Sequence, residues 1–464
     1  MKILQIAYYF PPMGGAGVQR GLKFARFLPL HGVQPVVLAC DDPFYVRDES
    51  LLGEVPTGLE VHRVAHSPWL ARLAARRRIS TAGAAPAVTA STAPAGPGLR
   101  SVLRDTALRS IRALQWPDDA APWARQALRQ ARHIVRSHAA AGAPIALVFS
   151  SAPPASAHWL GQRIAFEAGL PWVADHRDLW TDNPAYGAPA WRRALDRHTE
   201  QRWLNQASGV VTVTPSWREL LAQRCPAGTP VVFIPNGYDE DDFGALALPP
   251  RDPGTFTLVH TGTFYGPRDP AGLLSGLTRY LDGPLAHPDN GHPRLRVRLV
   301  GNMGARFAQA LAAFSQRYPG VVVSVPYLPH RQALAELVAA DALLLVVGGG
   351  RGPAVRGWLP GKIFEYLRSG QPVLTLGEPD GDAAQLIRQH SRGPVVAGDD
   401  SAAIAQALAD LVQGRWSAHA AAGGTIPLHG IDSSATSARI FERREGAGQL
   451  ANFLRECHAR HRGA

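Results

Sequence analysis

The chain has 464 residues, of which 46% are hydrophobic and 18% charged, with a formal net charge of +11 at pH 7. This length exceeds what one compact core usually supports, so we expect two or three domains in a soluble globular protein. No run of eighteen apolar, uncharged residues occurs, which excludes a membrane-spanning helix. The three scattered cysteines, Cys40, Cys225 and Cys457, exclude a disulfide framework and a cysteine metal set, and they fit a reducing cytoplasm.

The basic charge indicates an anionic partner, and composition leaves open whether this is a phosphate, an acidic lipid or nucleic acid. Only three of the 48 Lys and Arg residues are lysines, so Lys362 in its turn-bounded apolar stretch is a candidate functional residue. The short apolar N-terminus leads directly into a Pro-Pro loop without a small-residue cleavage site, so we expect no secretory signal.

The first half of the chain alternates between apolar strands and helical patterns. A strand over Ile3–Phe10, a Gly-rich loop, a helix over Val18–Leu30 and a strand over Pro35–Ala39 form a βαβ unit, which is typical of a parallel doubly wound sheet. Further strands are predicted at Ala146–Ser150, Trp172–Ala174, Gly209–Thr214 and Val231–Ile234. We therefore predict a Rossmann-like domain over residues 1–240.

An insertion interrupts this first domain. Residues 82–98 are almost all Ala, Pro, Thr, Ser and Gly, which predicts disorder. Basic residues flank it at Arg72 and Arg76–Arg78, and Ser101–Trp116 has helical spacing with many arginines. Two interpretations of this helix stay open: it lies on a membrane surface, or it packs on its own domain.

A second wound domain is predicted over residues 255–430, after a linker rich in Asp, Pro and Gly at Asn236–Gly254. Its strands are expected at Phe256–His260, Arg296–Val300, Val321–Val325, Ala342–Val347 and Pro372–Leu376. Residues 431–464 are predicted to form a C-terminal helical segment. The fold class is therefore α/β, with two Rossmann-like doubly wound domains facing across a cleft and ligands at the carboxyl ends of the strands.

Two motifs in the first domain carry candidate chemistry. Gly14 and Gly15 lie between a strand and a helix, where backbone N–H groups bind an anion, although a plain tight turn explains them too. The glycine spacing differs from the dinucleotide fingerprint. A later strand ends in four ionisable residues, Asp175, His176, Arg177 and Asp178, of which Asp175 or His176 is a candidate for a base or for steering an acceptor hydroxyl. The alternative is a structural Arg–Asp pair that caps the next helix, above all for Asp178.

In the second domain, Gly262 follows a strand and Arg268 precedes a helix, which suits a phosphate or a plain surface arginine. Lys362 opens a predicted helix and Glu365 lies one turn further on. A diphosphate would match Lys362 and the helix N-terminus, and Glu365 would accept hydrogen bonds from ribose hydroxyls. The alternative is an ordinary surface ion pair between them. The acidic run Asp239–Asp242 is expected to be a solvated turn, and we expect no metal site.

Taken in chain order, the motifs resemble those of the glycosyltransferase family 4 type with the GT-B fold. They are PPMGGAGVQR, VTVTPSW, FIPNGYDEDDF, HTGTFYG and LPGKIFEYLRSGQPVL. The likeness covers nearly the whole chain apart from the insertion and the last few dozen residues. It implies retaining, metal-independent transfer of a sugar from a nucleotide-sugar, with the donor on the second domain and the acceptor on the first.

The resemblance also implies roles for individual residues. Glu365 matches the ribose-binding glutamate, Lys362 or Arg268 holds the diphosphate, and the loop of Gly14 and Gly15 closes over the phosphates. The region of Asp175, His176 and Arg177 matches the place of a catalytic polar residue. Two positions depart from the family: Gly357 stands where a first glutamate is usual, and Gly262-Thr263 stands where Gly-Arg is usual.

We therefore expect an enzyme that moves a sugar from a nucleotide-diphosphate sugar to a lipid-linked or polysaccharide acceptor. No cofactor is expected, because the nucleotide-sugar is a substrate. Nucleic acid is not expected as a partner. The expected location is the cytoplasm, with peripheral contact to anionic lipid of the inner membrane. A non-catalytic nucleotide-sugar-binding homologue and a nucleotide-sugar epimerase stay open as alternatives.

Overall fold

A computed structural model describes residues 1–43, 45–66, 115–184, 186–264, 270–286, 291–348, 352–390, 393–416 and 439–463. The predicted insertion at 82–98, the basic residues Arg72 and Arg76–Arg78, and Arg268 lie outside these residues. Most of the helix predicted at Ser101–Trp116 lies outside them as well.

The chain forms two compact units. The first contains residues 1–213, 221–234 and 447–464, and the second contains residues 214–220 and 235–446. The predicted linker Asn236–Gly254 is therefore part of the second unit, and the end of the chain returns to the first unit. Sequence patterns predicted the helical character of this terminal segment but not the unit that it joins.

The first unit is built on a seven-stranded parallel sheet with the order β3-β2-β1-β4-β5-β6-β7. Its strands are β1 Lys2–Ala7, β2 Gln34–Asp41, β3 Val61–Ala65, β4 Leu147–Ala152, β5 Trp172–His176, β6 Gly209–Thr212 and β7 Val231–Phe233. Its helices are α1 Ala16–Phe27, α4 Ala121–Ala140, α5 Ser156–Ala168 and α6 Ala190–Leu204, with short 3-10 helices η1 Leu28–His31 and η2 Glu49–Glu54. Helix α7 Pro215–Ala222 follows β6, and its residues up to Leu220 belong to the second unit. The order of the strands reverses between β1 and β4, and ligands bind at such a point in doubly wound sheets.

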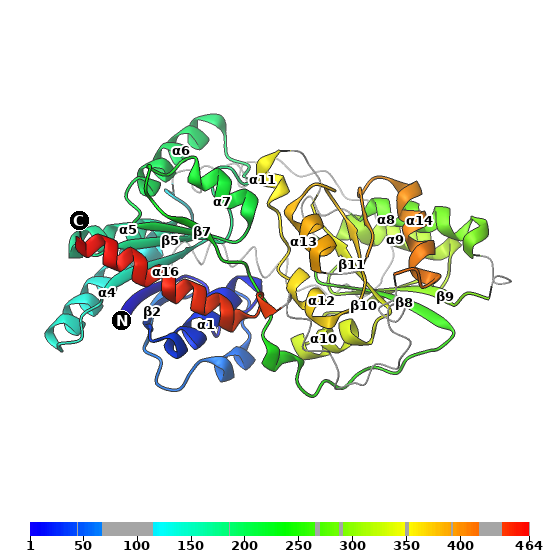
Figure 1. Ribbon diagram of the computed structural model, residues 1–464, viewed down its shortest axis with the longest axis horizontal. Coiled ribbons are helices and arrows are strands. Elements are labelled where there is room, and N and C mark those ends of the chain that lie inside the picture. The colour runs from blue at the N-terminus through cyan, green and yellow to red at the C-terminus, as the bar shows by residue number, and fades with distance from the viewer. Residues whose placement is uncertain are drawn as a thin grey trace, which may run out of the picture. The chain divides into compact units, whose positions relative to one another are not determined.

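The C-terminal helix α16 Arg443–Gly463 completes the core of the first unit from Ala447 onward. Its apolar residues Leu450 and Leu454 pack with Phe24 of α1 and Phe149 of β4. The contact is close: a Cβ atom at Gly209 would lie 2.6 Å from Cys457 Sγ, so β6 needs glycine here. Figure 1 shows α16 beside α1.

The second unit is built on a six-stranded parallel sheet with the order β10-β9-β8-β11-β12-β13. Its strands are β8 Thr255–Thr261, β9 Arg294–Val300, β10 Val322–Val325, β11 Ala342–Val346, β12 Val373–Leu376 and β13 Val395–Val396. The helices are α8 Ala271–Leu281, α9 Ala305–Arg317, α10 His330–Ala339, α11 Pro353–Arg356, α12 Ile363–Ser369, α13 Asp382–His390 and α14 Ser401–Val412, with 3-10 helices η3 Glu240–Phe243 and η4 Pro284–Ala286.

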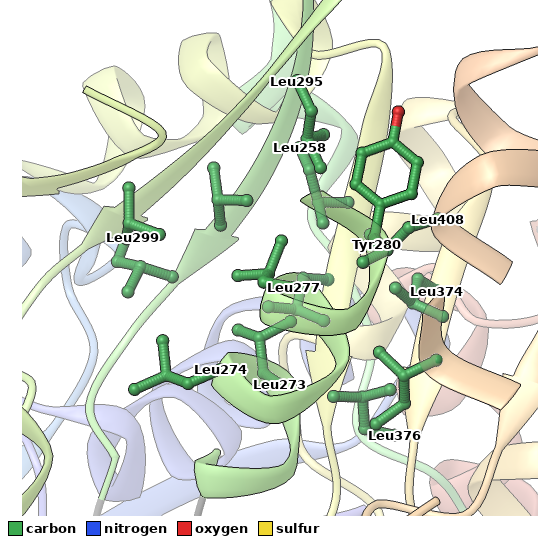
Figure 2. Close-up of a cluster of buried hydrophobic side chains, with 14 of the residues drawn as sticks. Leu258, Leu273, Leu274, Leu277, Tyr280, Leu295, Leu299, Leu374, Leu376 and Leu408 are labelled. Atoms are coloured by element: carbon green, nitrogen blue, oxygen red, sulfur yellow. The ribbon is translucent and has the colours of Figure 1, made fainter. Parts of the chain in front are cut away.

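Alternate residues of these strands face two separate apolar cores, as expected for a parallel sheet covered on both sides. On β11, Leu344 belongs to a cluster with α8 and α14, and Figure 2 shows Leu277 and Leu408 of those helices meeting over the sheet. Leu343 and Leu345 belong to the opposite cluster, which contains Phe364 of α12.

Every strand predicted from the sequence is present, with ends shifted by no more than three residues. β3 and β13 were not predicted; β3 is half-exposed along its length, so it lacks a continuous apolar run. The two parallel sheets with intervening helices confirm the predicted α/β class. Among the helices that the structure describes, none is long and apolar enough to cross a bilayer.

Candidate active site

Two glycines follow neighbouring strands at the carboxyl edge of the second unit's sheet. Gly262 follows β8 with φ 118°, and Gly301 follows β9 with φ 124°. A Cβ atom at Gly301 would lie 2.5 Å from the carbonyl oxygen of Gly262. The backbone conformation therefore favours glycine at both positions, and at Gly301 the close approach of the Gly262 carbonyl requires it as well.

The ammonium group of Lys362 lies over Gly262. A Cβ atom at Gly262 would be 2.5 Å from Lys362 Nζ, which also donates a hydrogen bond to the carbonyl oxygen of Thr261. Nζ is 3.3 Å from His260 Nε2, while His260 Nδ1 is 2.9 Å from the carbonyl oxygen of Leu344. Because a carbonyl can only accept, His260 carries its proton on Nδ1 and accepts from Lys362 at Nε2. The cation is thus fixed at the end of β8.

Glu365 lies one turn beyond Lys362, on α12. Its Oε1 atom is 2.8 Å from His330 Nε2, at the start of α10, and the hydrogen bond to Glu365 raises the pKa of His330. Among the described residues the carboxylate pairs with His330 and not with Lys362, so the surface-pair alternative for Lys362 and Glu365 does not apply. Oε2 makes no hydrogen bond to the described residues.

In the first unit, Asp175 is fully buried at the end of β5. Arg20 Nη2 is 2.8 Å from Asp175 Oδ1 and Arg20 Nε is 2.9 Å from Oδ2, while Ser151 Oγ donates to Oδ2 at 2.7 Å. Arg20 also donates to the carbonyl oxygen of Ile234 at 2.9 Å. This pair differs from the structural alternative left open by the sequence, an Arg–Asp pair that caps the next helix, because it joins Asp175 to Arg20 of α1. It suits a positioning role, and the catalytic role of Asp175 stays a prediction.

Arg177 connects the glycine loop to the end of β4. Its guanidinium donates to the carbonyl oxygen of Gly17, and to that of Pro153 at 2.7 Å. Burial lowers the pKa of Arg177. The two glycines predicted to bind an anion, Gly14 and Gly15, differ in their surroundings. The N–H of Gly14 donates to the carbonyl oxygen of Val46 at 2.7 Å, whereas Gly15, with φ 85°, is the N-cap of α1. Gly15 is therefore better placed than Gly14 to face an anion, and both roles stay predictions.

His176 ends β5 and is almost fully buried. Its ring lies 4.5 Å from that of His158, which in turn contacts Ser150 Oγ at 2.8 Å through Nδ1. Burial lowers the pKa of His176, so the imidazole is neutral near pH 7. Its ring makes no hydrogen bond in the described part of the chain. Of the three predicted residues at this strand end, His176 is the one whose side chain makes no hydrogen bond to the described residues.

Comparisons with known proteins bear on this arrangement. Residues 88–242 match the model of Glycosyltransferase Family 4. The structure is similar to that of HepE from Anabaena, solved with UDP, with a TM-score of 0.61 and 15% identity over 98% of this chain and 100% of that one. It is also similar to sucrose-phosphate synthase from Thermosynechococcus elongatus, with a TM-score of 0.59 and 14% identity over 99% of both chains. The comparison with curated proteins gave no significant match.

A third similar structure is the lipopolysaccharide outer core galactosyltransferase WaaB, with a TM-score of 0.53 and 12% identity over 98% of this chain and 99% of that one. The chain has the GT-B fold, and the match of residues 88–242 to Glycosyltransferase Family 4 supports a glycosyltransferase. The predicted fold class and the predicted enzyme class are confirmed. The GT-B fold places two Rossmann-like units in one chain, as the strand orders of both sheets show.

This glycosyltransferase has a structural reason for Gly357, the position where a glutamate is usual in family 4. A Cβ atom at Gly357 would overlap the indole of Trp217 and lie 2.9 Å from Thr214 Oγ1. Trp217 is buried and donates from Nε1 to the carbonyl oxygen of Ala354 at 2.9 Å. The indole therefore fills the space that a side chain at residue 357 would need.

Three residues that shape the transferase site were not predicted: His260, His330 and Arg20. His330 follows Pro329 at the start of a helix, where a basic residue opposes the helix dipole, and this signal was readable. His260 lies two residues before Gly262, but its stacking on Phe264 at 4.3 Å appears only in the fold. Arg20 lies on the buried face of α1 with no local partner in sequence.

In the acidic run, Asp239 caps η3 and Glu240 pairs with Arg368.

Proposed function

We propose that this glycosyltransferase moves a sugar, with retention, from a nucleotide-diphosphate sugar to a lipid-linked or polysaccharide acceptor at a membrane surface. One observation carries the donor side of the proposal. The ammonium group of Lys362 is held over Gly262 at the carboxyl end of β8, one helical turn from a carboxylate. A nucleoside diphosphate needs a cation for its phosphates and a hydrogen-bond acceptor for its ribose, at about this separation.

The lack of a side chain at Gly262 gives room for Lys362 Nζ above this strand end, and a cation held there supports a phosphate at this edge. Oε2 of Glu365 suits the vicinal hydroxyls of a ribose. HepE, similar in fold, has been solved with UDP and with UDP-glucose, which supports a nucleotide-sugar as the donor.

The proposed chemistry follows from this placement. As the bond from the sugar to the diphosphate breaks, negative charge grows on the leaving oxygen, and the fixed cation of Lys362 stabilises it without reorganisation. Lys362 thus supplies charge that a metal ion would otherwise supply, and the proposed reaction needs no cofactor. The resemblance to family 4 assigns the role of base to the leaving phosphate. The neutral ring of His176 is proposed to orient the acceptor hydroxyl on the first unit.

The net charge of +11 supports an acceptor at an anionic surface. It also agrees with the proposal of peripheral attachment at the cytoplasmic face of the inner membrane.

The donor proposal is tested by calorimetric titration of UDP, GDP and ADP into the wild type and Lys362→Met, which keeps the length of the side chain. We expect one nucleoside diphosphate to bind, with a loss of affinity of about tenfold or more in the variant. Equal affinity in the two proteins would contradict the role of Lys362. Product analysis then separates the function classes: free nucleoside diphosphate with a new glycoside supports transfer, an isomerised nucleotide-sugar indicates an epimerase, and binding without turnover indicates a binding homologue.

A further inference from the structure

Helix α6 of the first unit has an unusual distribution of side chains. Its two acidic residues, Asp196 and Glu200, are 0% and 1% exposed, whereas Trp191 and Leu195 are 60% and 46% exposed. A helix on a protein surface normally buries its large apolar residues and exposes its charges. In α6 this pattern is reversed over the first two turns.

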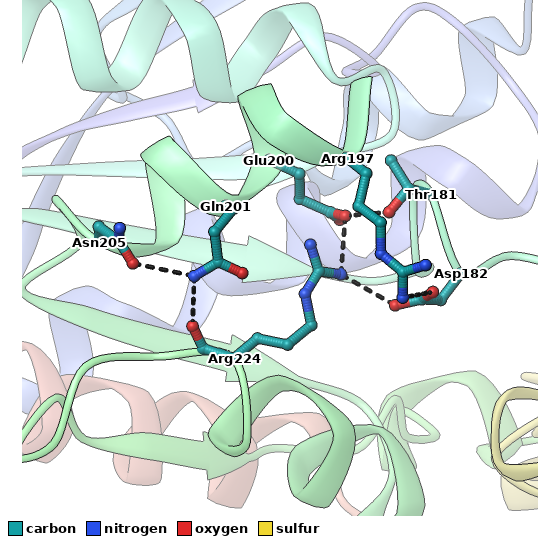
Figure 3. A network of polar contacts seen from close by, with 7 residues as sticks. All are labelled: Thr181, Asp182, Arg197, Glu200, Gln201, Asn205 and Arg224. Carbon is teal, nitrogen blue, oxygen red and sulfur yellow. Dashed lines mark hydrogen bonds and ion pairs between the residues drawn. The ribbon is translucent and has the colours of Figure 1, made fainter. Parts of the chain in front are cut away.

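The inner face of α6 is fixed by its charges. Arg192 Nε is 2.9 and 2.8 Å from the two carboxylate oxygens of Asp196, and Arg192 Nη2 donates to the carbonyl oxygen of Pro117 at 2.7 Å. Glu200 accepts from Arg224 at 2.9 Å and from Thr181 Oγ1. Figure 3 shows this second network joining α6 to the loop after β5.

Because these buried groups are paired, α6 cannot rotate to bury Trp191 without leaving charges unpaired in the interior. The exposure of its apolar residues is therefore a fixed property of the fold. Such an exposed pair of large apolar side chains on an anchored helix indicates a surface that meets a non-aqueous partner.

The outward-facing residues of α6 form one stripe along the helix. Positions Trp191, Leu195, His198 and Arg202 recur every three to four residues, so they share one side of α6, and all four are exposed. Arg193 and Arg197 flank the stripe; Arg197 is 3.0 Å from Asp182, and Arg193 donates to the carbonyl oxygen of Tyr186 at 2.8 Å. Every exposed ionisable side chain of α6 is thus basic, because both acids of the helix are buried.

The neighbouring helices carry further basic side chains, with one acid, Glu167 of α5, paired to Arg132 of α4 and to Arg163. α5 contacts both α4 and α6, so the three helices form one layer over the sheet. Helix α4 contains no acidic residue, and its exposed side chains include Arg125, Arg129 and Arg136. A layer with a Trp-Leu pair and basic residues around it matches the interface of an anionic bilayer, where indole rings and arginines are both favoured.

From these observations we infer that the outer face of α6, formed by Trp191, Leu195, His198 and Arg202, docks on an anionic lipid bilayer. The inference rests on the proposed function, since it supplies the surface that brings the enzyme to a lipid-linked acceptor. Trp191 lies at the end of α6 that follows the loop from β5, and β5 carries His176 at its carboxyl end. A bilayer at this end would present the lipid-linked acceptor on the acceptor side of the chain.

The test is cosedimentation of the full chain with vesicles of phosphatidylcholine alone or mixed with phosphatidylglycerol. We expect binding to the mixed vesicles only, weakened by added salt because exposed charges are screened. The double variant Trp191→Ala, Leu195→Ala should bind at least about tenfold more weakly, since each large apolar side chain contributes about that factor. Arg202→Gln should weaken binding about fivefold.

The matched control is Tyr327→Ala, which removes an aromatic side chain that is 78% exposed on the second unit. It should bind vesicles as the wild type does. Equal binding by the double variant and the wild type would overturn the inference and assign attachment to the basic segments before α4. Equal binding of the wild type to neutral vesicles would overturn it as well.

Failure of this inference differs from failure of the proposed function. Titration of the nucleoside diphosphate into the double variant should match that of the wild type, because α6 carries no donor-binding residue. An unchanged thermal midpoint would show that the double variant is folded.

Discussion

His330 Nε2 lies 2.8 Å from Glu365 Oε1 and joins the start of α10 to α12. The contact orients the carboxylate that we propose for ribose binding, and Oε2 has no hydrogen-bond partner among the described residues. It also makes the site sensitive to pH, because His330 is charged only when protonated.

The first prediction concerns this pH dependence. Glu365 raises the pKa of His330 above its ordinary value of 6.5, so the pair stabilises the fold fully below pH 6.5. This stability is lost as the pH rises through the raised pKa. Since the His330 side chain is 47% exposed, the effect should stay below about 1 kcal/mol. Urea unfolding of the wild type and His330→Gln should differ more at low than at high pH; a difference that grows with pH would contradict the pairing.

The second prediction concerns the glycine under Lys362. Gly262→Ala should destabilise the second unit by about 1–3 kcal/mol, because φ is positive and the new methyl group meets Nζ. It should also weaken nucleotide binding by displacing the cation. Gly361→Ala is the matched control, since a Cβ atom there meets nothing within 4 Å. Calorimetric melting measures the stability of the two variants. If Gly262→Ala and Gly361→Ala were equally stable, the close contact between residue 262 and Lys362 would be refuted.

The third prediction concerns Gly357 and Trp217. Gly357→Ala should destabilise the fold by about 1–3 kcal/mol, since overpacking a filled site costs about this much. Trp217→Ala makes room, so the double variant should lose less stability than the sum of the two single changes. Additive losses in this cycle would show that the indole does not fill the space of residue 357.

The fourth prediction separates the two neighbouring residues of β5. Asp175→Ala leaves Arg20 buried without its carboxylate partner, so it should cost about 3–5 kcal/mol in the free energy of unfolding. His176→Ala breaks no hydrogen bond within the described structure and should cost less. If His176 orients the acceptor, this variant should keep its affinity for nucleotide and lose turnover. Loss of stability equal to that of Asp175→Ala would make His176 structural.

Features of the fold that depend on neighbouring residues were predicted from the sequence, whereas contacts between residues far apart in the chain were not. Strands such as β11 and β12 are continuous apolar runs, and local pattern predicts them to within one residue. The short half-exposed strand β3 has no such run and was missed. Helix α16 was predicted as helix, but its packing against Phe24 depends on residues more than 400 positions away.

The candidate site shows the same division. Lys362 and Gly262 were predicted because a rare lysine and a glycine stand beside turn signals, and the structure brings them together. The pairing of Glu365 with His330 was not predicted, because a contact between side chains of α10 and α12 is not visible in a local spacing rule. Arg20 pairs with Asp175 across 155 positions, which no motif encodes.

The central claim is that Glu365 and Lys362 bind a nucleoside diphosphate. Isothermal titration of UDP, with GDP and ADP as alternatives, into the wild type, Glu365→Ala and Glu240→Gln tests it most directly. Glu240 pairs with Arg368 on the same helix but lies outside the proposed ribose contact, so its variant controls for disturbance of α12. We predict binding of one nucleoside diphosphate to the wild type and to Glu240→Gln, and at least about tenfold weaker binding to Glu365→Ala. Unchanged affinity in Glu365→Ala, or no binding of any of the three to the wild type, would contradict the account.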